Sequence, residues 1–303
     1  MYENNKEVFS PIRLGVDIGG TNIKFAVLEG KELLHTDIIK TAEKSDDIID
    51  DIVKKYNEFN RKWNISTVGV GTPGSIINGL VSAANLSFKK FPLKQRLEER
   101  ISLPVTVEND ANCAALGELE FGAATDCDNL VLVTIGTGIG GGVAINRQVC
   151  CGKGKFGEIG HMIIQAEGGL PCKCGLSGCW EQYVSATALI REAEKAALEN
   201  KESLIYKLYR ENANSLNGEK VFEAIEQKCP VAMRVYDKYI YYMVMGLESV
   251  NKIFYPDAII LTGGITKQGD KLLKSIKANL KSDMRIEISN LQAIAGVLGA
   301  AML

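Results

Sequence analysis

Residues 16–28 read VDIGGTNIKFAVL, and residues 133–145 read VTIGTGIGGGVAI. Laid over one another, the two stretches share Val, Ile and Gly at their first, third and fourth positions. Each places apolar residues on both sides of a Gly-rich turn, which is typical of a two-stranded hairpin. So short a match is compatible with chance, but two copies at the heads of two halves favour an internal duplication. We therefore expect two α/β lobes with a cleft between them.

The segments around these hairpins predict the rest of each lobe. Residues 12–40 predict a three-stranded antiparallel meander, and the next helix has Ser45 as its expected N-cap. Apolar residues follow at helical spacing, at Ile48, Ile52, Tyr56, Phe59 and Trp63. Further strands are expected at 67–71, 103–109, 258–264 and 285–289, and further helices at 92–101, 111–122, 231–255 and 291–303. We place the boundary between the lobes near 118–122.

The composition excludes several classes of protein. The 303 residues are 46% hydrophobic and 24% charged with a net charge of −2, which is ordinary for a globular chain of one large or two smaller domains. No basic stripe is present, which argues against nucleic acid as a partner. The polar N-terminus lacks a signal sequence, and the longest apolar run, AIAGVLGAAML (293–303), is too short to span a membrane. We expect a cytoplasmic protein with reduced cysteines and no membrane partner.

Three Gly-rich turns are candidates for binding a nucleotide. Gly-rich backbone lets N–H groups approach a phosphate closely. The carboxylate of Asp17 would repel a bare phosphate, so it indicates a bound Mg²⁺ or water beside it. Any one of these could be an ordinary tight turn, but the three together favour nucleotide binding, although no Walker sequence occurs. The candidate residues are Asp17, Gly19, Gly20, Thr21, Lys24, Thr137, Gly138, Gly263 and Gly264.

The stretch ENDAN (108–112) contains a candidate general base. Asn109 and Asp110 stand where a predicted strand ends and a helix begins. Asn and Asp are favoured helix N-caps, and most such residues do only that. A carboxylate at a strand end also faces the ligand-binding edge of an α/β sheet, where it could accept a hydroxyl proton during phosphoryl transfer.

A second cluster combines Cys172, Cys174 and Cys179 with the upstream His161. The pattern C-x-C-G-x-x-G-C supplies three thiolates, and the histidine completes a four-ligand set for tetrahedral Zn²⁺. Buried free cysteines or a redox pair are the alternatives, but the loop is polar and Gly-rich and lacks C-x-x-C. Four protein ligands close the shell, so we expect a structural zinc ion.

Five motifs together resemble the ROK family of repressors, open reading frames and sugar kinases. They are DIGGT (17–21), ENDAN (108–112), GTGIGGG (136–142), GEIGH (157–161) and CKCGLSGCWE (172–181). The resemblance spans nearly the whole chain and implies an actin-like, hexokinase-like (ribonuclease H-like) α/β fold of two lobes closing on a sugar and ATP. It also implies that the terminal helix packs on the first lobe, so that the lobes comprise residues 1–118 plus 291–303 and residues 119–290.

The resemblance also implies roles for single residues. Asp110 would be the catalytic base, and His161 would bind zinc through one ring nitrogen and face the sugar with the other. The zinc loop would then hold carboxylates against the sugar hydroxyls. The implied sugar-binding residues are Gly74, Asn85, Asn109, Asp110, Glu158, His161 and Glu181.

The resemblance therefore predicts an ATP- and Mg²⁺-dependent hexose kinase, above all a glucokinase acting on the 6-hydroxyl. N-acetylmannosamine kinase, fructokinase and β-glucoside kinase stay open within the class. A sugar-responsive transcriptional regulator is the alternative from another class, but only about a dozen residues precede the first hairpin, too few for a helix-turn-helix module. The family also implies a homo-oligomer, either a dimer or a tetramer.

Overall fold

The computed structural model describes residues 10–83 and 86–303, which form two compact units. The first unit comprises Met1–Asp126, Ala144–Phe156 and Ala293–Leu303, and the second comprises Cys127–Val143 and Gly157–Gln292. The boundary that we place near 118–122 from the sequence stays a prediction. Within the described ranges, no helix combines the length and the apolar character that crossing a membrane requires.

The first unit is built on a five-stranded sheet. Its strands, in sheet order, are β3 (Glu32–Lys40), β2 (Asn22–Glu29), β1 (Ile12–Ile18), β4 (Thr67–Thr72) and β7 (Val105–Asn109). The strands β1, β2 and β3 are antiparallel, which confirms the predicted meander. The strands β4 and β7 run parallel to β1 and to each other, so the carboxyl ends of all three meet at one edge of the sheet.

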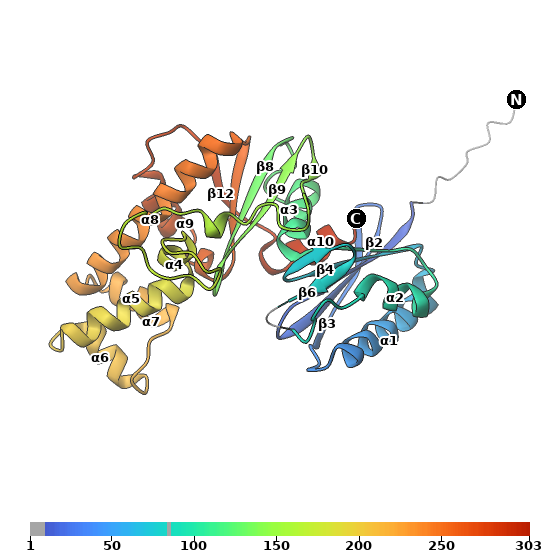
Figure 1. The fold of residues 1–303 in the computed structure, drawn as a ribbon, viewed down its shortest axis with the longest axis horizontal. Coiled ribbons are helices and arrows are strands. Elements are labelled where there is room, and N and C mark those ends of the chain that lie inside the picture. The colour runs from blue at the N-terminus through green and yellow to red at the C-terminus, as the bar shows by residue number, and fades with distance from the viewer. Residues whose placement is uncertain (1–9, 84–85) are drawn as a thin grey trace, which may run out of the picture. The chain divides into compact units, whose positions relative to one another are not determined.

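One face of this sheet is covered by α1 (Ser45–Trp63) and α2 (Leu93–Ile101), which lie side by side (Figure 1). The predicted apolar face of α1 is buried from Ile48 to Phe59, together with alternate residues of β1. The predicted N-cap is wrong: Ser45 is the first helical residue, and its hydroxyl donates to the carbonyl oxygen of Ser87, 2.9 Å away. A short hairpin of β5 (Ser75–Ile77) and β6 (Leu80–Ser82) follows β4.

At Gly15 of β1 and its neighbour Gly69, the chain's last helix approaches the strands without an intervening side chain. That helix, α10 (Ala295–Ala300), follows the 3-10 turn η3 (Gln292–Ile294) and also packs on α3 (Asp110–Phe121). A Cβ added to Gly15 would lie 2.1 Å from the Val297 oxygen, and one added to its neighbour Gly69 would lie 1.8 Å from the Ala300 oxygen. Only glycine fits at these two positions, so the C-terminus is fixed to the first sheet.

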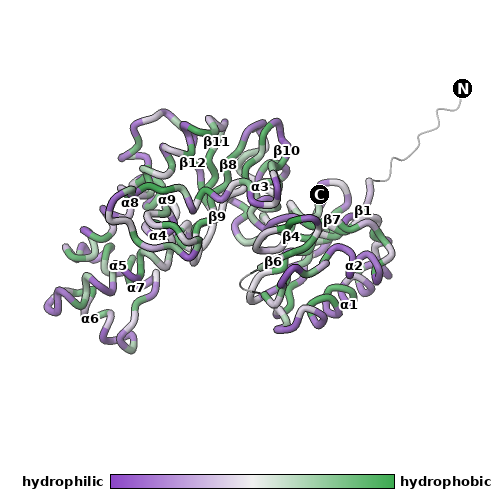
Figure 2. The backbone as a smooth tube through the Cα atoms, in the orientation of Figure 1, coloured by the Kyte–Doolittle hydropathy of each residue, from purple (hydrophilic) through white to green (hydrophobic). Residues whose placement is uncertain are grey.

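The second sheet has the order β10 (Gln148–Val149), β9 (Ile139–Ile145), β8 (Leu130–Ile135), β11 (Ala258–Thr262) and β12 (Ile286–Ile288). The last three strands are parallel, and β8 and β11 are continuous hydrophobic segments (Figure 2). All five residues of β11 are buried, as expected for a parallel strand covered on both faces.

Helices and 3-10 turns complete the second unit. They are η1 (Ile159–His161), α4 (Glu181–Val184), α5 (Ala186–Glu199), α6 (Leu204–Glu211), α7 (Gly218–Glu226), α8 (Pro230–Phe254), η2 (Gly264–Gln268) and α9 (Asp270–Lys277). The long helix α8 anchors the segment before α4, because Trp180 is fully buried against Gly246 and donates its indole N–H to the Tyr242 oxygen, 2.9 Å away.

Candidate active site and metal cluster

Polar residues of the first unit gather at the edge where β1, β4 and β7 end. In the sheet register, Asp17 lies opposite Gly71, and the next residue, Thr72, lies opposite Asn109. Asp110 follows Asn109 directly, as the first residue of α3. The sheet therefore brings the predicted metal-facing carboxylate and the predicted base to the same edge.

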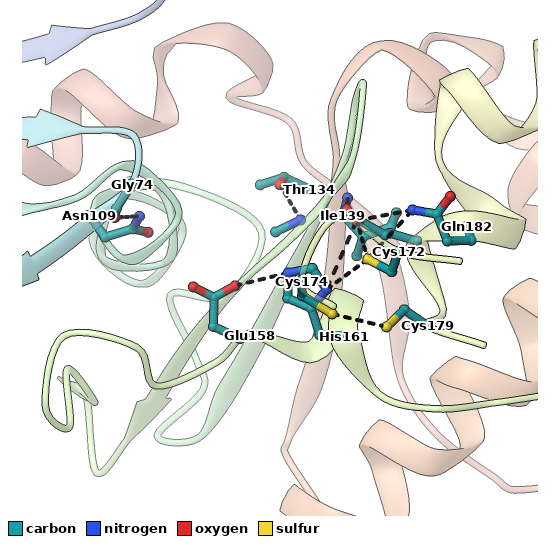
Figure 3. Close-up of polar contacts among 12 residues, drawn as sticks. Gly74, Asn109, Thr134, Ile139, Glu158, His161, Cys172, Cys174, Cys179 and Gln182 are labelled. Atoms are coloured by element: carbon teal, nitrogen blue, oxygen red, sulfur yellow. Dashed lines mark hydrogen bonds and ion pairs between the residues drawn. The ribbon is translucent and has the colours of Figure 1, made fainter. Parts of the chain in front are cut away.

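Asn109 is the N-cap of α3, as its position in the sequence predicts. Its side-chain oxygen accepts hydrogen bonds from the backbone N–H groups of Ala111, at 2.9 Å, and of Asn112, at 3.4 Å. Its Nδ2 donates to the carbonyl oxygen of Gly74, 3.0 Å away (Figure 3). Gly74 has a φ of 91°, a conformation that favours glycine, so the turn and the amide fix one another.

Asp110 is half-buried, and its Oδ1 accepts the N–H of Ala111 at 2.9 Å. Burial raises the pKa of the Asp110 carboxyl, the negative charge of Asp17 raises it further, and the bond from Ala111 opposes both. A carboxylate with a raised pKa is a stronger base than an exposed aspartate. This environment suits the proposed acceptance of a proton.

Glu108 has a structural part that the sequence did not reveal. Its Oε1 accepts from the backbone N–H of Asn109, at 2.7 Å, and from Nδ2 of Asn112, at 2.9 Å. Its Oε2 accepts the thiol of Cys151, whose sulfur lies 2.9 Å away. Glu108 thus supports the strand end that carries Asn109 and Asp110. The acidic residue inside ENDAN was a signal, whereas nothing in the sequence pointed to Cys151.

The DIGGT turn of the first unit joins β1 to β2. The N–H of Gly19 donates to the Asn22 oxygen at 2.9 Å, and the oxygens of Gly19 and Thr21 both accept from Thr41. Lys24 faces Asp17 across the hairpin, with Nζ 3.2 Å from Oδ2 of Asp17 and 2.7 Å from the Ala293 oxygen. These bonds use two of the three hydrogens of the Lys24 ammonium.

In the second unit, two predicted turns end the adjacent parallel strands β8 and β11. Thr134 pairs with Thr262 in the register, so the turn with Thr137 and Gly138 and the turn with Gly263 and Gly264 lie side by side. The Thr187 hydroxyl donates to the Thr137 oxygen at 2.9 Å, and Thr134 accepts the N–H of Gly140 at 3.1 Å (Figure 3). A Cβ on Gly264 would meet no atom within 4 Å, so a ligand can approach this backbone closely.

The predicted metal ligands converge in the second unit. One ligand atom from each of His161, Cys172, Cys174 and Cys179 lies within 4.8 Å of all the others. The sulfurs of Cys174 and Cys179 are 3.6 Å apart, and the Cys172 sulfur is 3.5 Å from Nδ1 of His161 (Figure 3). Zinc bonds of about 2.0–2.3 Å in a tetrahedron separate ligand atoms by roughly 3.4–3.8 Å. The donor set and its spacing therefore fit Zn²⁺.

The loop folds around this cluster through its own backbone. Gly175 and Gly178 have φ values of 94° and 84°, which reverse the chain between the cysteines. Burial raises the pKa of the Cys172 thiol and raises that of Cys179 to about 12, whereas the N–H of Leu176 lowers the pKa of Cys174. A bound cation would stabilise the thiolate form of the two buried sulfurs.

The proposed sugar-binding residues of the second unit adjoin the cluster. His161 turns Nδ1 towards Cys172 and lies with Nε2 3.9 Å from Oε2 of Glu158, which is 54% exposed. The carboxylate of Glu181 has Oε1 3.3 Å from the Cys172 sulfur and Oε2 3.5 Å from the N–H nitrogen of Ile139. Glu181 thus links the candidate metal ligands to the turn after β8, a contact that sequence reasoning missed. Asn85 lies outside the described residues.

Two α/β units, each with Gly-rich turns at the ends of parallel strands, are typical of the class of actin-like ATPases. The sequence profile of the ROK family matches residues 13–303, and the chain belongs to this family. It is 36% identical to a glucokinase of Halalkalibacterium halodurans, over 96% of this chain and 94% of that protein.

Two solved structures are similar to this protein over 96% of the chain. The ROK family glucokinase from Streptomyces griseus, in complex with glucose and AMPPNP, has a TM-score of 0.79 and 33% identity, over 96% of this chain and 98% of that one. The ROK hexokinase from Thermus thermophilus has a TM-score of 0.83 and 30% identity, over 96% and 97%. The two-lobed actin-like fold expected from the sequence is confirmed.

Proposed function

We propose that this protein is an ATP-dependent hexose kinase, a glucokinase that phosphorylates the 6-hydroxyl of the sugar. The observation that carries the proposal is the environment of Asp110, a half-buried carboxyl of raised pKa at the ligand-binding edge of the first sheet. The similarity to proteins named glucokinase, one of them in complex with glucose and AMPPNP, supports the choice of substrates.

In the proposed reaction, Asp110 accepts the proton of the 6-hydroxyl as that oxygen attacks the γ-phosphorus of ATP. The bond between the γ-phosphorus and the bridging oxygen breaks, and ADP leaves with that oxygen. Asn109 fixes the start of α3 and the Gly74 turn, so it would hold Asp110 in position while leaving one hydrogen of its amide for the sugar.

The sugar would be held by Glu158, His161 and Glu181. Carboxylates suit this task because each can accept hydrogen bonds from two neighbouring hydroxyls. The ring orientation of His161 favours Nδ1 as the metal ligand, which would leave Nε2 for the sugar. Zn²⁺, held by His161 and the three cysteines, would supply structural cross-linking of this loop.

The Gly-rich turns are the proposed contacts for ATP. In the first unit, the third hydrogen of the Lys24 ammonium is available for a phosphate oxygen, and the Asp17 carboxylate suits Mg²⁺ or its water. When bound, Mg²⁺ supplies charge neutralisation to the phosphates. In the second unit, the backbone around Gly138 and Gly264 would receive the rest of the nucleotide. A cytoplasmic location and a homo-oligomeric state stay predictions.

The test is a coupled assay of ADP formation with a panel of hexoses, using the full chain with Mg²⁺ and zinc. We expect glucose-dependent turnover whose product is oxidised by glucose-6-phosphate dehydrogenase, which reports phosphorylation at the 6-position. The Asp110→Asn variant, prepared in parallel, measures contaminating kinases. If no hexose stimulates ADP formation above that background, the proposal is wrong.

A further inference from the structure

The second unit contains a cavity that none of the proposed catalytic residues lines. It lies between α5, α8 and the segment that leads into the zinc loop, and its volume is about 510 Å³. Cavities of roughly 300–1,000 Å³ are the size that holds small-molecule ligands. All of its lining residues belong to this unit, so its walls do not depend on any other part of the chain.

The lining of this cavity carries three positive charges. They are Lys195 of α5 and, one helical turn apart on α8, Arg234 and Lys238. Within the ranges 10–83 and 86–303, no ion pair engages any of the three, although other surface cations are paired. Two acidic residues also line the cavity, and one of them, Glu192, already pairs with Arg191 at 3.2 Å. The charge of Glu199 alone is then set against the three positive charges of the lining. The cavity therefore favours an anion.

Three tyrosines also line the cavity, and their side chains are held rigidly. The rings of Tyr183 and Tyr242 have centroids 4.4 Å apart, and Tyr239 is 3% exposed with its hydroxyl bonded to the Val184 oxygen at 2.8 Å. Each of the other two hydroxyls is also fixed. That of Tyr183 accepts the N–H of Leu170 at 2.8 Å, and that of Tyr242 donates to the side-chain oxygen of Gln165 at 3.3 Å. Such rings offer flat apolar surface to a sugar or a base.

We propose that this cavity binds a phosphorylated ring compound, with the phosphate on Lys195, Arg234 and Lys238 and the ring against the tyrosines. Arginine and lysine together provide the charge-assisted hydrogen bonds that phosphate requires. A phosphosugar and a nucleoside monophosphate share this chemistry. Because Gln165 and Leu170 belong to the loop that carries the cysteines, such a ligand contacts the segment that holds the metal cluster.

The test is calorimetric titration of the full-length, zinc-loaded protein with glucose and AMPPNP present at saturation. The probes are glucose 6-phosphate, AMP and inorganic phosphate. We expect one equivalent of glucose 6-phosphate or AMP to bind, and the dissociation constant to rise roughly tenfold or more in Arg234→Gln/Lys238→Gln, since charged hydrogen bonds are lost. Lys252→Gln, on the same helix but outside the cavity, is the matched control and should bind as the wild type does.

A second variant, Ala196→Trp, fills the cavity from α5 without changing its charge and should abolish binding of the ring compounds. Circular dichroism of each variant checks that it is folded. The proposal is overturned if neither ring compound binds at millimolar concentration, if the double variant binds as tightly as the wild type, or if inorganic phosphate binds as tightly as both ring compounds. The comparison between variants does not require kinase activity, so its failure is distinguishable from that of the proposed function.

Discussion

Asn109 donates a hydrogen bond from Nδ2 to the carbonyl oxygen of Gly74, 3.0 Å away, while its Oδ1 caps α3. One side chain therefore joins the helix that begins with Asp110 to the turn that follows β4. Because both ends of the amide are used, the two functions can be separated by substitution. The serine variant keeps an acceptor for the cap, whereas the alanine variant keeps neither function.

We expect Asn109→Ala to lower the free energy of unfolding by about 1 kcal/mol or somewhat more, the usual cost of losing an N-cap. Asn109→Ser should lose clearly less, since serine caps helices well. Both should raise the KM for the sugar, because both release the Gly74 turn. Urea unfolding and steady-state kinetics measure the two effects. An alanine variant as stable as the wild type would contradict the structural part of this assignment.

Asp110→Asn should lower kcat by roughly 10²–10⁴, the usual contribution of a positioned base. The variant should nevertheless be at least as stable as the wild type at pH 7. Because the folded-state pKa of Asp110 is raised, the stability that its protonated form provides is present at low pH and is lost as pH rises through that pKa. The amide removes this loss. A variant that unfolds at a lower temperature than the wild type would contradict the raised pKa of Asp110. A variant that turns over normally would exclude Asp110 as the general base.

The acid limb of the pH profile of kcat/KM should report the same group. The negative charge of Asp17 raises the pKa of Asp110, so Asp17→Asn should move the acid limb to lower pH. Lys24→Gln removes the cation that neutralises Asp17 and should move the limb to higher pH. Residual activity suffices for both profiles. Shifts in the same direction for the two variants would disprove this electrostatic coupling.

Purified protein should contain one tightly bound zinc ion per chain, and Cys174→Ser should lose it, because three ligands hold zinc less firmly than four. Cys150→Ser, outside the cluster, is the matched control and should retain the metal. Elemental analysis and thermal unfolding with and without a chelator measure the effect. Zinc content unchanged in Cys174→Ser, or absent from the wild type, would refute the site.

Local sequence patterns predicted the helices and strands well, because hydrophobic periodicity and helix capping depend on neighbouring residues. The meander of residues 12–40 and the cap at Asn109 follow from alternation and from residue type. The N-cap at Ser45 failed for a tertiary reason, since its hydroxyl bonds to Ser87, far along the chain. The four candidate metal ligands could be brought together from the sequence because they lie within nineteen positions and are of unusual type.

Contacts between distant segments left no such pattern. The thiol of Cys151 bonds to Glu108, and Gly69 makes room for α10. The sequence around Cys151 and around Gly69 gives no sign of either contact. Glu181 was predicted to face the sugar, but its contact with Ile139 depends on how α4 packs beside β9. The cations of the α5–α8 cavity are likewise ordinary surface residues until the two helices are placed together.

The last prediction concerns the choice of sugar. Glu158 and Glu181 are acceptor-only when ionised, so they should prefer a sugar face that presents free hydroxyl donors. An N-acetyl group replaces one hydroxyl with an amide that donates one N–H but adds a methyl and a carbonyl. The added carbonyl cannot pair with a carboxylate, and a site built for hydroxyls discriminates against an analogue that leaves buried groups unpaired.

We therefore expect a higher kcat/KM for glucose than for N-acetylmannosamine, measured at one saturating ATP concentration. The ring of Phe88 is 1% exposed and stacks on that of Phe91 with centroids 5.0 Å apart, so it is not available to contact a sugar. Glu158→Gln supplies an N–H donor that could meet the acetyl carbonyl. It should therefore reduce the ratio of kcat/KM for glucose to kcat/KM for N-acetylmannosamine, and it should do so by a larger factor than it changes the KM for ATP. A clear preference of the wild type for the N-acetyl sugar would overturn the glucokinase assignment, yet it would leave the role of Asp110, the zinc site and the kinase class intact.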